Sequence, residues 1–273
     1  MARSTSGESV MERVLRIIEA FDVSTPVLTV SEIARRADLP VTTAHRLVNE
    51  LVDLRMLERA GPYQIRIGLR MWELSSRSSR VVRLRDVALP FMEDLHAVVR
   101  QHTQLGVLDG DEVLYIERLS APGSMANATY VAGRLPAHAC SAGLVLLAFA
   151  SADVREEILS QPLARYTPNT VTDPQQLRKI FADIRVQGHC LADSMTIPNA
   201  VGAAAPVFDA NGDIVAALTI VVPSDADRIV GHIPALMTAA RGISRTVGIA
   251  GFNLTLPLAS DTKFLAIHRK NRR

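Results

Sequence analysis

The sequence predicts an α+β protein with an N-terminal winged helix-turn-helix domain, a linker helix and a C-terminal domain built on an antiparallel sheet. Between residues 29 and 70, two short amphipathic helix patterns flank a tight turn and precede a hairpin pattern. Beyond residue 86, helix and strand patterns alternate, and Asp109-Gly110 and Asn211-Gly212 join apolar runs as hairpin turns do. At 273 residues the chain is long enough for two domains.

The charge distribution agrees with a division of the chain into parts. We expect a winged helix-turn-helix domain over 1–70, a linker helix over 71–85, a second domain over 86–250 and a flexible basic tail over 251–273. Residues 1–85 hold 14 arginines and 10 acidic residues, whereas residues 86–250 hold 11 basic and 17 acidic residues. A basic N-terminal segment followed by an acidic middle segment is consistent with a nucleic-acid-binding domain joined to a domain of different function.

The first domain begins with an amphipathic helix over about 8–22, which supplies an apolar floor for the two helices that follow. Thr29 and Glu32 have the spacing of a capping box and start the second helix. Asp38-Leu39-Pro40 ends it, because proline cannot continue the hydrogen-bond ladder. The third helix places small and branched apolar residues at three- and four-residue spacings up to Leu54. Two short helices joined by a tight turn predict a helix-turn-helix.

The polar residues of this domain predict contacts with double-stranded DNA. The outer face of the third helix carries donors and a cation that suit base edges and phosphates, namely Thr42, Thr43, His45, Arg46 and Asn49. Ser31 and Arg35 on the preceding helix are candidate phosphate contacts, with solvated surface as the equal alternative. A hairpin, or wing, turns at Gly61-Pro62 and offers Tyr63 and Arg66 to the backbone. The competing interpretation of the whole motif is an ordinary helix pair and hairpin with a solvated polar face.

The rest of the chain predicts the elements of the linker and the second domain. The linker helix over 69–84 carries Met71, Trp72 and Leu74, which we expect to pack on an apolar surface. The expected helices that follow span 87–101, 139–149, 153–159, 173–186 and 225–249. The expected strands span 103–108, 112–117, 126–131, 203–208 and 214–222.

Composition excludes several classes of protein. No apolar run approaches the ~20 residues that a membrane-spanning helix needs. The N-terminus lacks an apolar secretion segment, so we expect a cytoplasmic protein with no membrane partner. Two cysteines, Cys140 and Cys190, cannot build a disulfide framework or a cysteine-rich zinc site. We expect no metal and no cofactor.

His138 and Cys140 raise the alternative of a nucleophilic enzyme, with histidine as the base. Their spacing of two residues does not itself bring the side chains together, and no third orienting residue is evident. A packed or hydrogen-bonded histidine is the favoured interpretation. Gly188-His189-Cys190 is similarly interpreted as the end of a helix and not as a metal site.

Several motifs in the same order resemble the IclR family of bacterial transcriptional regulators. They are Leu28–Ala37, Thr42–Leu47, Arg134–Ala139, Ala204–Gly212 and Val215–Leu218. The resemblance runs from Val10 to Ile249 and implies a winged-helix domain, a linker helix and a C-terminal GAF/PAS-like sensor domain. It also implies homodimers or homotetramers, and a small organic acid effector that changes operator binding through the domain over 86–250.

Departures from the family pattern bear on the effector. Gly143 is followed by leucine where the family has lysine, and Asp193 is the sole carboxylate where an acidic cluster is usual. Gly202 stands where cysteine is common, and Val221 replaces one of two small hydroxyl residues while Thr219 keeps the other. A less polar pocket favours a larger, partly hydrophobic ligand such as an aromatic acid. The resemblance gives as effector-binding candidates Leu135, His138, Ser141, Asp193, Gly202, Thr219 and Val221.

The favoured function is a ligand-responsive DNA-binding transcriptional regulator, with repression the more common mode in the family. Backbone N–H groups and Ser141 remain able to hold a carboxylate, while Asp193 either orients the effector or caps a turn. One alternative is an enzyme that acts on a small acid near His138 and Cys140. The other is a DNA-binding dimer whose C-terminal domain is purely structural.

Overall fold

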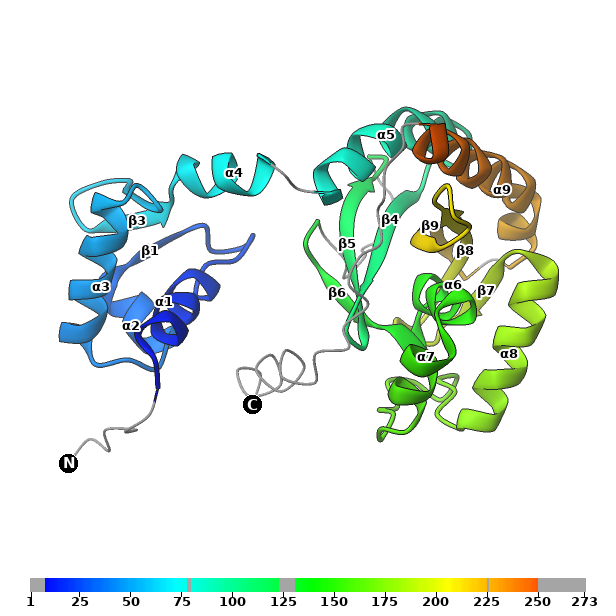
Figure 1. The fold of residues 1–273 in the computed structure, drawn as a ribbon, viewed down its shortest axis with the longest axis horizontal. Coiled ribbons are helices and arrows are strands. Elements are labelled where there is room, and N and C mark those ends of the chain that lie inside the picture. The colour runs from blue at the N-terminus through cyan, green and yellow to red at the C-terminus, as the bar shows by residue number, and fades with distance from the viewer. Residues whose placement is uncertain (1–7, 78–79, 123–130, 225, 250–273) are drawn as a thin grey trace. The chain divides into compact units, whose positions relative to one another are not determined.

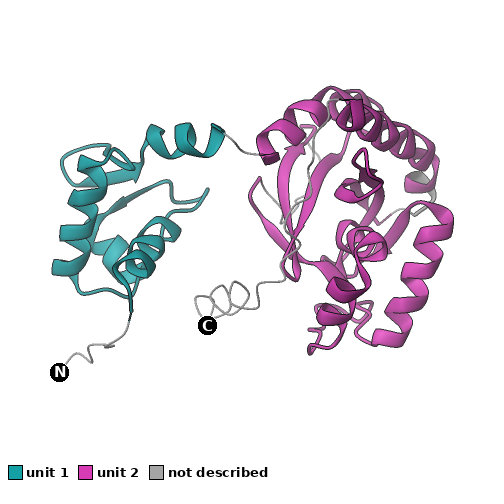
Figure 2. Ribbon diagram, in the orientation of Figure 1, with its two compact units in different colours: residues 1–79 teal, residues 80–273 magenta. Residues whose placement is uncertain are grey.

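The computed structural model describes residues 8–77, 80–122, 131–224 and 226–249 of the chain (Figure 1). Two compact units divide the sequence, residues 1–79 and residues 80–273 (Figure 2). Each unit has a hydrophobic core of its own. The two units are therefore described separately.

The first unit is a winged helix-turn-helix, as the sequence predicts. Its helices are α1 (Val10–Glu19), α2 (Val30–Arg36), α3 (Val41–Asp53) and α4 (Leu69–Ser76). Its strands β1 (Val27–Thr29), β2 (Leu57–Arg59) and β3 (Gln64–Ile67) form an antiparallel sheet in the order β1-β3-β2. Ile17, Ile33, Leu47 and Ile65 are buried together, so α1, α2, α3 and the wing share one core. Strand β1 was not expected from the sequence.

The capping box at the start of α2 is present. The hydroxyl of Thr29 accepts the backbone N–H of Glu32 at 3.3 Å, and the carboxylate of Glu32 accepts the backbone N–H of Thr29 at 2.7 Å. The hydroxyl of Thr29 also donates to this carboxylate at 2.8 Å, and the bonds that the carboxylate accepts from the backbone N–H and then the hydroxyl of Thr29 lower the pKa of Glu32. At the other end Asp38 adopts a left-handed backbone with φ of 50°. The predicted turn before Pro40 is therefore confirmed, and it directs the chain from α2 into α3.

Thr29→Ala is expected to lower the free energy of unfolding of the first unit by about 1 kcal/mol, because an N-cap hydroxyl is lost. Urea-dependent hydrogen exchange of peptides from α2 and α3 measures this change. Thr42→Ala is the matched control: Thr42 is exposed, and α3 begins without a side-chain cap, so its effect should stay within ~0.5 kcal/mol. Equal losses in the two variants would contradict a capping role.

The predicted linker helix over 71–85 is two helices in the structure. Helix α4 ends at Ser76, and α5 (Arg80–Val99) already begins at Arg80. Leu84, Ala88 and Met92 are buried on one face of α5, in the core of the second unit. Helix α5 is therefore part of the second unit from its first turns. The expected packing of Trp72 is not found in the described residues, where its side chain is 68% exposed.

The second unit is built on a six-stranded sheet in which every neighbouring pair is antiparallel. Its strands, in the order β6-β5-β4-β9-β8-β7, are β4 (His102–Asp109), β5 (Glu112–Leu119), β6 (Arg134–Pro136), β7 (Cys190–Asp193), β8 (Ala200–Phe208) and β9 (Ile214–Pro223). Both predicted hairpins are confirmed, β4–β5 and β8–β9. The strand expected over 126–131 falls almost wholly on residues 123–130, outside the described residues. Strands β6 and β7 were not expected.

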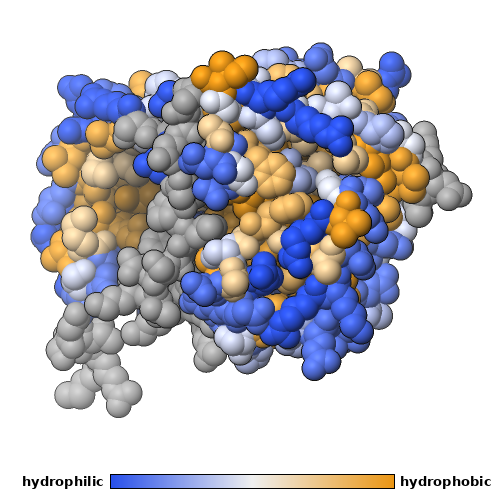
Figure 3. Space-filling view, turned by 45° about the vertical axis from the view of Figure 1, so that its right-hand side comes forward, coloured by the Kyte–Doolittle hydropathy of each residue, from blue (hydrophilic) through white to orange (hydrophobic). Residues whose placement is uncertain are grey.

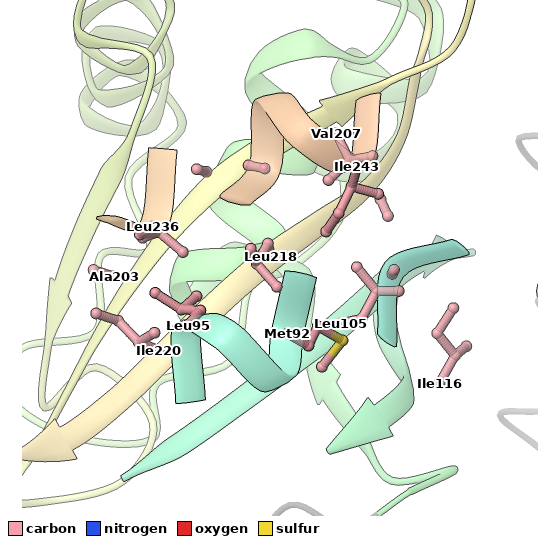
Figure 4. Close-up of a cluster of buried hydrophobic side chains, with 14 of the residues drawn as sticks. Met92, Leu95, Leu105, Ile116, Ala203, Val207, Leu218, Ile220, Leu236 and Ile243 are labelled. Atoms are coloured by element: carbon pink, nitrogen blue, oxygen red, sulfur yellow. The ribbon is translucent and has the colours of Figure 1, made fainter. Parts of the chain in front are cut away.

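Helices cover both faces of this sheet (Figure 1). Helices α5 and α9 (Ala226–Ile249) pack on one face, where Met92, Leu105, Leu218 and Ile243 meet (Figure 4). The other face is covered by α6 (Ser141–Phe149), α7 (Ala152–Leu159) and α8 (Pro174–Gln187). A short 3-10 turn, η1 (Ala137–Ala139), leads into α6. None of the helices that the structure describes combines the length and the apolar character that crossing a bilayer requires.

Candidate DNA-binding surface and ligand pocket

Helix α3 presents one apolar and one polar face, as expected of a recognition helix. Its buried face consists of Ala44, Leu47, Val48 and Leu51. On the opposite face, the side chains of Thr42, His45 and Arg46 are exposed, and those of Thr43 and Asn49 are partly exposed. The helix therefore offers all five predicted polar residues to a partner.

Three of these residues are held by neighbours on the same surface. Arg46 forms an ion pair with Glu50 one turn along the helix, at 2.5 Å. The amide nitrogen of Asn49 lies 3.2 Å from Nδ1 of His45, and its oxygen accepts a hydrogen bond from Arg59 at 2.9 Å. Arg59 lies on β2 and was not singled out from the sequence, because only folding of the wing brings it beside α3. This network orients Asn49 before any partner binds.

The wing supplies the remaining candidates. Tyr63, near its tip, is 81% exposed. Arg66 donates to one carboxylate oxygen of Glu58 at 3.0 and 3.2 Å, and the other oxygen accepts the backbone N–H of Leu69 at 2.9 Å. The bond from Leu69 and then that from Arg66 lower the pKa of Glu58. The predicted phosphate contacts on α2, Ser31 and Arg35, are also exposed.

A pocket lies in the second unit between the sheet, the start of α6 and the segment after β7. Four predicted residues line it: Leu135, Ser141, Gly202 and Val221. The remaining lining residues were not predicted, and they are Gln104, Tyr115, Ala139, Cys140, Ala192, Met195, Thr196, Ile197 and Ala200. The pocket wall is thus mostly apolar, with hydroxyl, thiol and amide groups.

The missing side chain of Gly202 leaves space for this pocket. A Cβ atom built on Gly202 would lie 2.6 Å from Oγ of Ser141, closer than real Cβ atoms come. Ser141 is the first residue of α6, so the pocket meets the N-terminus of that helix. Backbone N–H groups at a helix N-terminus carry partial positive charge and favour an anion.

The structure does not place the other three predicted residues on the pocket wall. His138 is buried, donates from Nε2 to the carbonyl of Ala164 at 2.9 Å, and has its ring beside that of Tyr166. Asp193 is exposed because alternate residues of β7 face outward, and its carboxylate accepts the hydroxyl of Ser194 at 2.8 Å.

Thr219 is buried on β9, where it pairs with Gln104 on one side and Ala204 on the other. Its hydroxyl oxygen has no hydrogen-bond partner among the described residues. Thr219 is not among the residues that line the pocket.

The chemistry at Cys140 does not match an activated nucleophile. Burial raises the pKa of its thiol to about 11, although the backbone N–H of Gly143 and the hydroxyl of Tyr115 oppose this by bonding to the sulfur. A catalytic thiolate needs a lowered pKa and a nearby base. The imidazole of His138 bonds to Ala164 instead. Across the described ranges, no three His, Cys, Asp or Glu side chains gather as a metal site.

Two family models together match most of the chain. The IclR helix-turn-helix domain matches residues 10–61, and the C-terminal domain of bacterial transcriptional regulator IclR matches residues 76–245. Among characterised proteins, the chain is 30% identical to the HTH-type transcriptional regulator BhcR of Paracoccus denitrificans, over 89% of this chain and 88% of that protein. It is 27% identical to the Pca regulon regulatory protein of Pseudomonas putida, over 77% and 72%.

Solved structures agree with these matches. An IclR homolog from Microbacterium hydrocarbonoxydans, crystallised with 4-hydroxybenzoate, is 45% identical with a TM-score of 0.83, and the alignment covers 88% of this chain and 99% of that one. The regulator RHA06195 from Rhodococcus sp. RHA1 is 30% identical with a TM-score of 0.75, over 88% and 98%. The chain therefore belongs to the IclR family of bacterial transcriptional regulators, with an N-terminal helix-turn-helix domain and a C-terminal effector-binding domain.

Proposed function

We propose that this regulator binds its operator through α3 and the wing, and that an aromatic carboxylic acid bound in the pocket changes operator affinity. The observation that carries the choice of ligand is the composition of the pocket. The helix N-terminus and the hydroxyl at Ser141 stand against a mostly apolar wall, and no acidic side chain is among the described lining residues. The 4-hydroxybenzoate of the Microbacterium homolog is a ligand of this class.

The proposed pose follows from the donors at the start of α6 and the apolar side chains elsewhere on the wall. The carboxylate accepts hydrogen bonds from the hydroxyl of Ser141 and from backbone N–H groups of the first turn of α6, where the helix dipole favours negative charge. The ring lies among Leu135, Met195 and Val221. An apolar wall with a few placed polar groups is the usual construction of a small-molecule site.

We propose that the DNA-binding form is a homodimer or a larger homo-oligomer. Helix α4 has no buried residue, and Leu69 and Trp72 on it are 71% and 68% exposed. A second copy would cover this apolar surface, which a lone chain leaves in water. Two recognition helices then read half-sites about one helical turn apart, or a multiple of it. An effector can act only if it binds the DNA-competent and DNA-incompetent states with different affinities.

Ser141→Ala is expected to weaken binding of 4-hydroxybenzoate about tenfold, because a hydrogen bond to a charged group is lost. Isothermal titration calorimetry measures the Kd. Ser160→Ala is the matched control: Ser160 is exposed after α7 and its hydroxyl donates to the carbonyl of Glu157. Equal Kd values in the wild type and Ser141→Ala would contradict the pose. No binding of any aromatic acid by the wild type, with operator binding intact, would instead support a purely structural C-terminal domain.

We propose that the protein binds its acid without converting it. The supporting observations are the raised pKa of Cys140 and the separate hydrogen bond of His138. Incubation of 4-hydroxybenzoate with purified protein, followed by chromatography, is expected to return the acid unchanged. Consumption of the acid that disappears in Cys140→Ala would establish the enzyme alternative.

A further inference from the structure

A second cavity of about 630 Å³ lies in the second unit, between α9, the outer half of β8 and the ends of α6 and α8. Its lining residues are Phe149, Gly188, Ala205, Pro206, Phe208, Met237, Thr238, Ala240, Arg241, Ser244 and Arg245. None of them lines the effector pocket. We name this cavity the α9 groove. Its volume is within the ~300–1,000 Å³ usual for small-molecule sites.

The floor of the α9 groove is apolar because Phe149, Ala205, Pro206 and Phe208 line it, at a place where the edge of the sheet is open. Strand β7 pairs only with residues 201–204 of β8, so among the described residues no strand covers 205–208 on that side. Pro206, which cannot donate to a neighbouring strand, suits such an edge. The rings of Phe149 and Phe208 pack edge to face, with 5.1 Å between their centroids, and they form the aromatic part of the floor. On the face seen in Figure 3, hydrophobic residues form patches among hydrophilic ones.

The rim of the α9 groove is cationic. Arg241 and Arg245 are one helical turn apart on α9, and both are exposed. Neither takes part in a salt bridge with an acidic residue in the described part of the chain. The hydroxyl of Ser244 is already engaged, since it donates to the carbonyl of Ala240 and accepts the N–H of Phe208. The two guanidinium groups are thus the main donors available to a ligand.

We propose that the α9 groove is a second ligand site, which takes an amphipathic organic anion with an aromatic or apolar body and a carboxylate head. The body covers the Phe149–Phe208 floor, and the carboxylate meets the forked donors of Arg241 and Arg245. A second copy of the chain is a poorer occupant. Two copies related by a two-fold axis through the groove would bring four guanidinium groups together without an acid between them.

The probe for this site is 6-bromo-2-naphthoate, titrated by calorimetry into the full chain carrying Gly202→Val, which fills the effector pocket. One equivalent is expected to bind. Arg241→Gln with Arg245→Gln should raise Kd about tenfold, because the charged hydrogen bonds to the carboxylate are lost. The uncharged 6-bromo-2-naphthamide should bind about tenfold more weakly for the same reason. Thr238→Trp, which places an indole in the groove, should abolish binding.

Arg100→Gln with Lys179→Gln is the matched control, since it removes two exposed positive charges outside the groove. In this control the Kd for 6-bromo-2-naphthoate should stay within twofold of its value in the Gly202→Val protein. Anomalous scattering from bromine in a crystal of the complex is expected to place the atom beside Phe149 and Phe208. The proposal is overturned if the crystal shows bromine only at sites outside the α9 groove. It is equally overturned if the double arginine variant and the control have equal Kd values for the probe. It is also overturned if the Gly202→Val protein binds no probe, and dissociation of an oligomer by Thr238→Trp in sedimentation would then identify a second copy of the chain as the occupant. None of these readouts depends on 4-hydroxybenzoate, so they stand apart from the proposed effector.

Discussion

Replacing Arg46 with alanine is expected to weaken operator binding by about 10- to 100-fold, or roughly 1.4–2.7 kcal/mol. Arg46 is exposed on the polar face of α3, and its ion pair with Glu50 is on the surface and contributes little to folding. A bidentate contact with guanine, or a clamp on a phosphate, is lost in the variant. Fluorescence anisotropy with a labelled operator at fixed salt measures the change.

Two further variants separate this effect from a general loss of charge. Arg178→Ala removes an arginine of the same kind, exposed and paired with Glu156, from α8 of the second unit; its operator Kd should not change. Glu50→Gln releases Arg46 and removes a negative charge from the DNA-facing surface, so operator binding should tighten. Calorimetry should show unchanged 4-hydroxybenzoate binding in Arg46→Ala. Operator affinity equal to that of the wild type would place the recognition surface elsewhere.

Replacing Gly202 with valine is expected to weaken 4-hydroxybenzoate binding at least ~100-fold, through loss of space in the pocket. The new Cβ would start 2.6 Å from Oγ of Ser141, and the two methyl groups would extend into the cavity. Overpacking a filled site costs ~1–3 kcal/mol, and here the ligand must also be displaced. Because valine favours strands and Gly202 lies within β8, the fold should tolerate the change.

Gly231→Val is the matched control for this variant. Gly231 lies on α9, and a Cβ built on it meets no atom within 4 Å. Both variants should bind the operator, measured by gel shift, but only Gly202→Val should lose the response to 4-hydroxybenzoate. A response that survives in Gly202→Val would mean that the effector binds outside this pocket.

The first unit could be predicted in detail because its signals are local. The Thr29–Glu32 capping box and the Pro40 break each act within about one turn of helix, and the structure contains both. The hairpins of the second unit could be predicted equally well from their Asp-Gly and Asn-Gly turns. In the structure Gly110 and Gly212 have the positive φ values that such turns require. Such signals depend on neighbouring residues, so they can be recognised without the rest of the fold.

The ligand pocket could be predicted only in part. Ser141 and Gly202 were named from family positions, but Gln104, Tyr115 and Met195 carry no local signal that marks them as a pocket wall. Asp193 was a candidate either to orient the ligand or to cap a turn, and the alternation of side chains along β7 turns it outward. That alternation could not be assigned from the sequence, because β7 itself was not expected.

By itself the sequence determined the family, the helix-turn-helix with its wing, and the two hairpins, because turn chemistry and apolar periodicity are properties of short segments. Only the tertiary structure decided that the helix containing Leu84 belongs to the second unit, that Arg59 holds Asn49, and that Phe149 and Arg245 border one groove. These relations join residues of different elements. They are fixed by how strands pair and cores pack, and the free energy of that packing is shared among many contacts that no short motif contains.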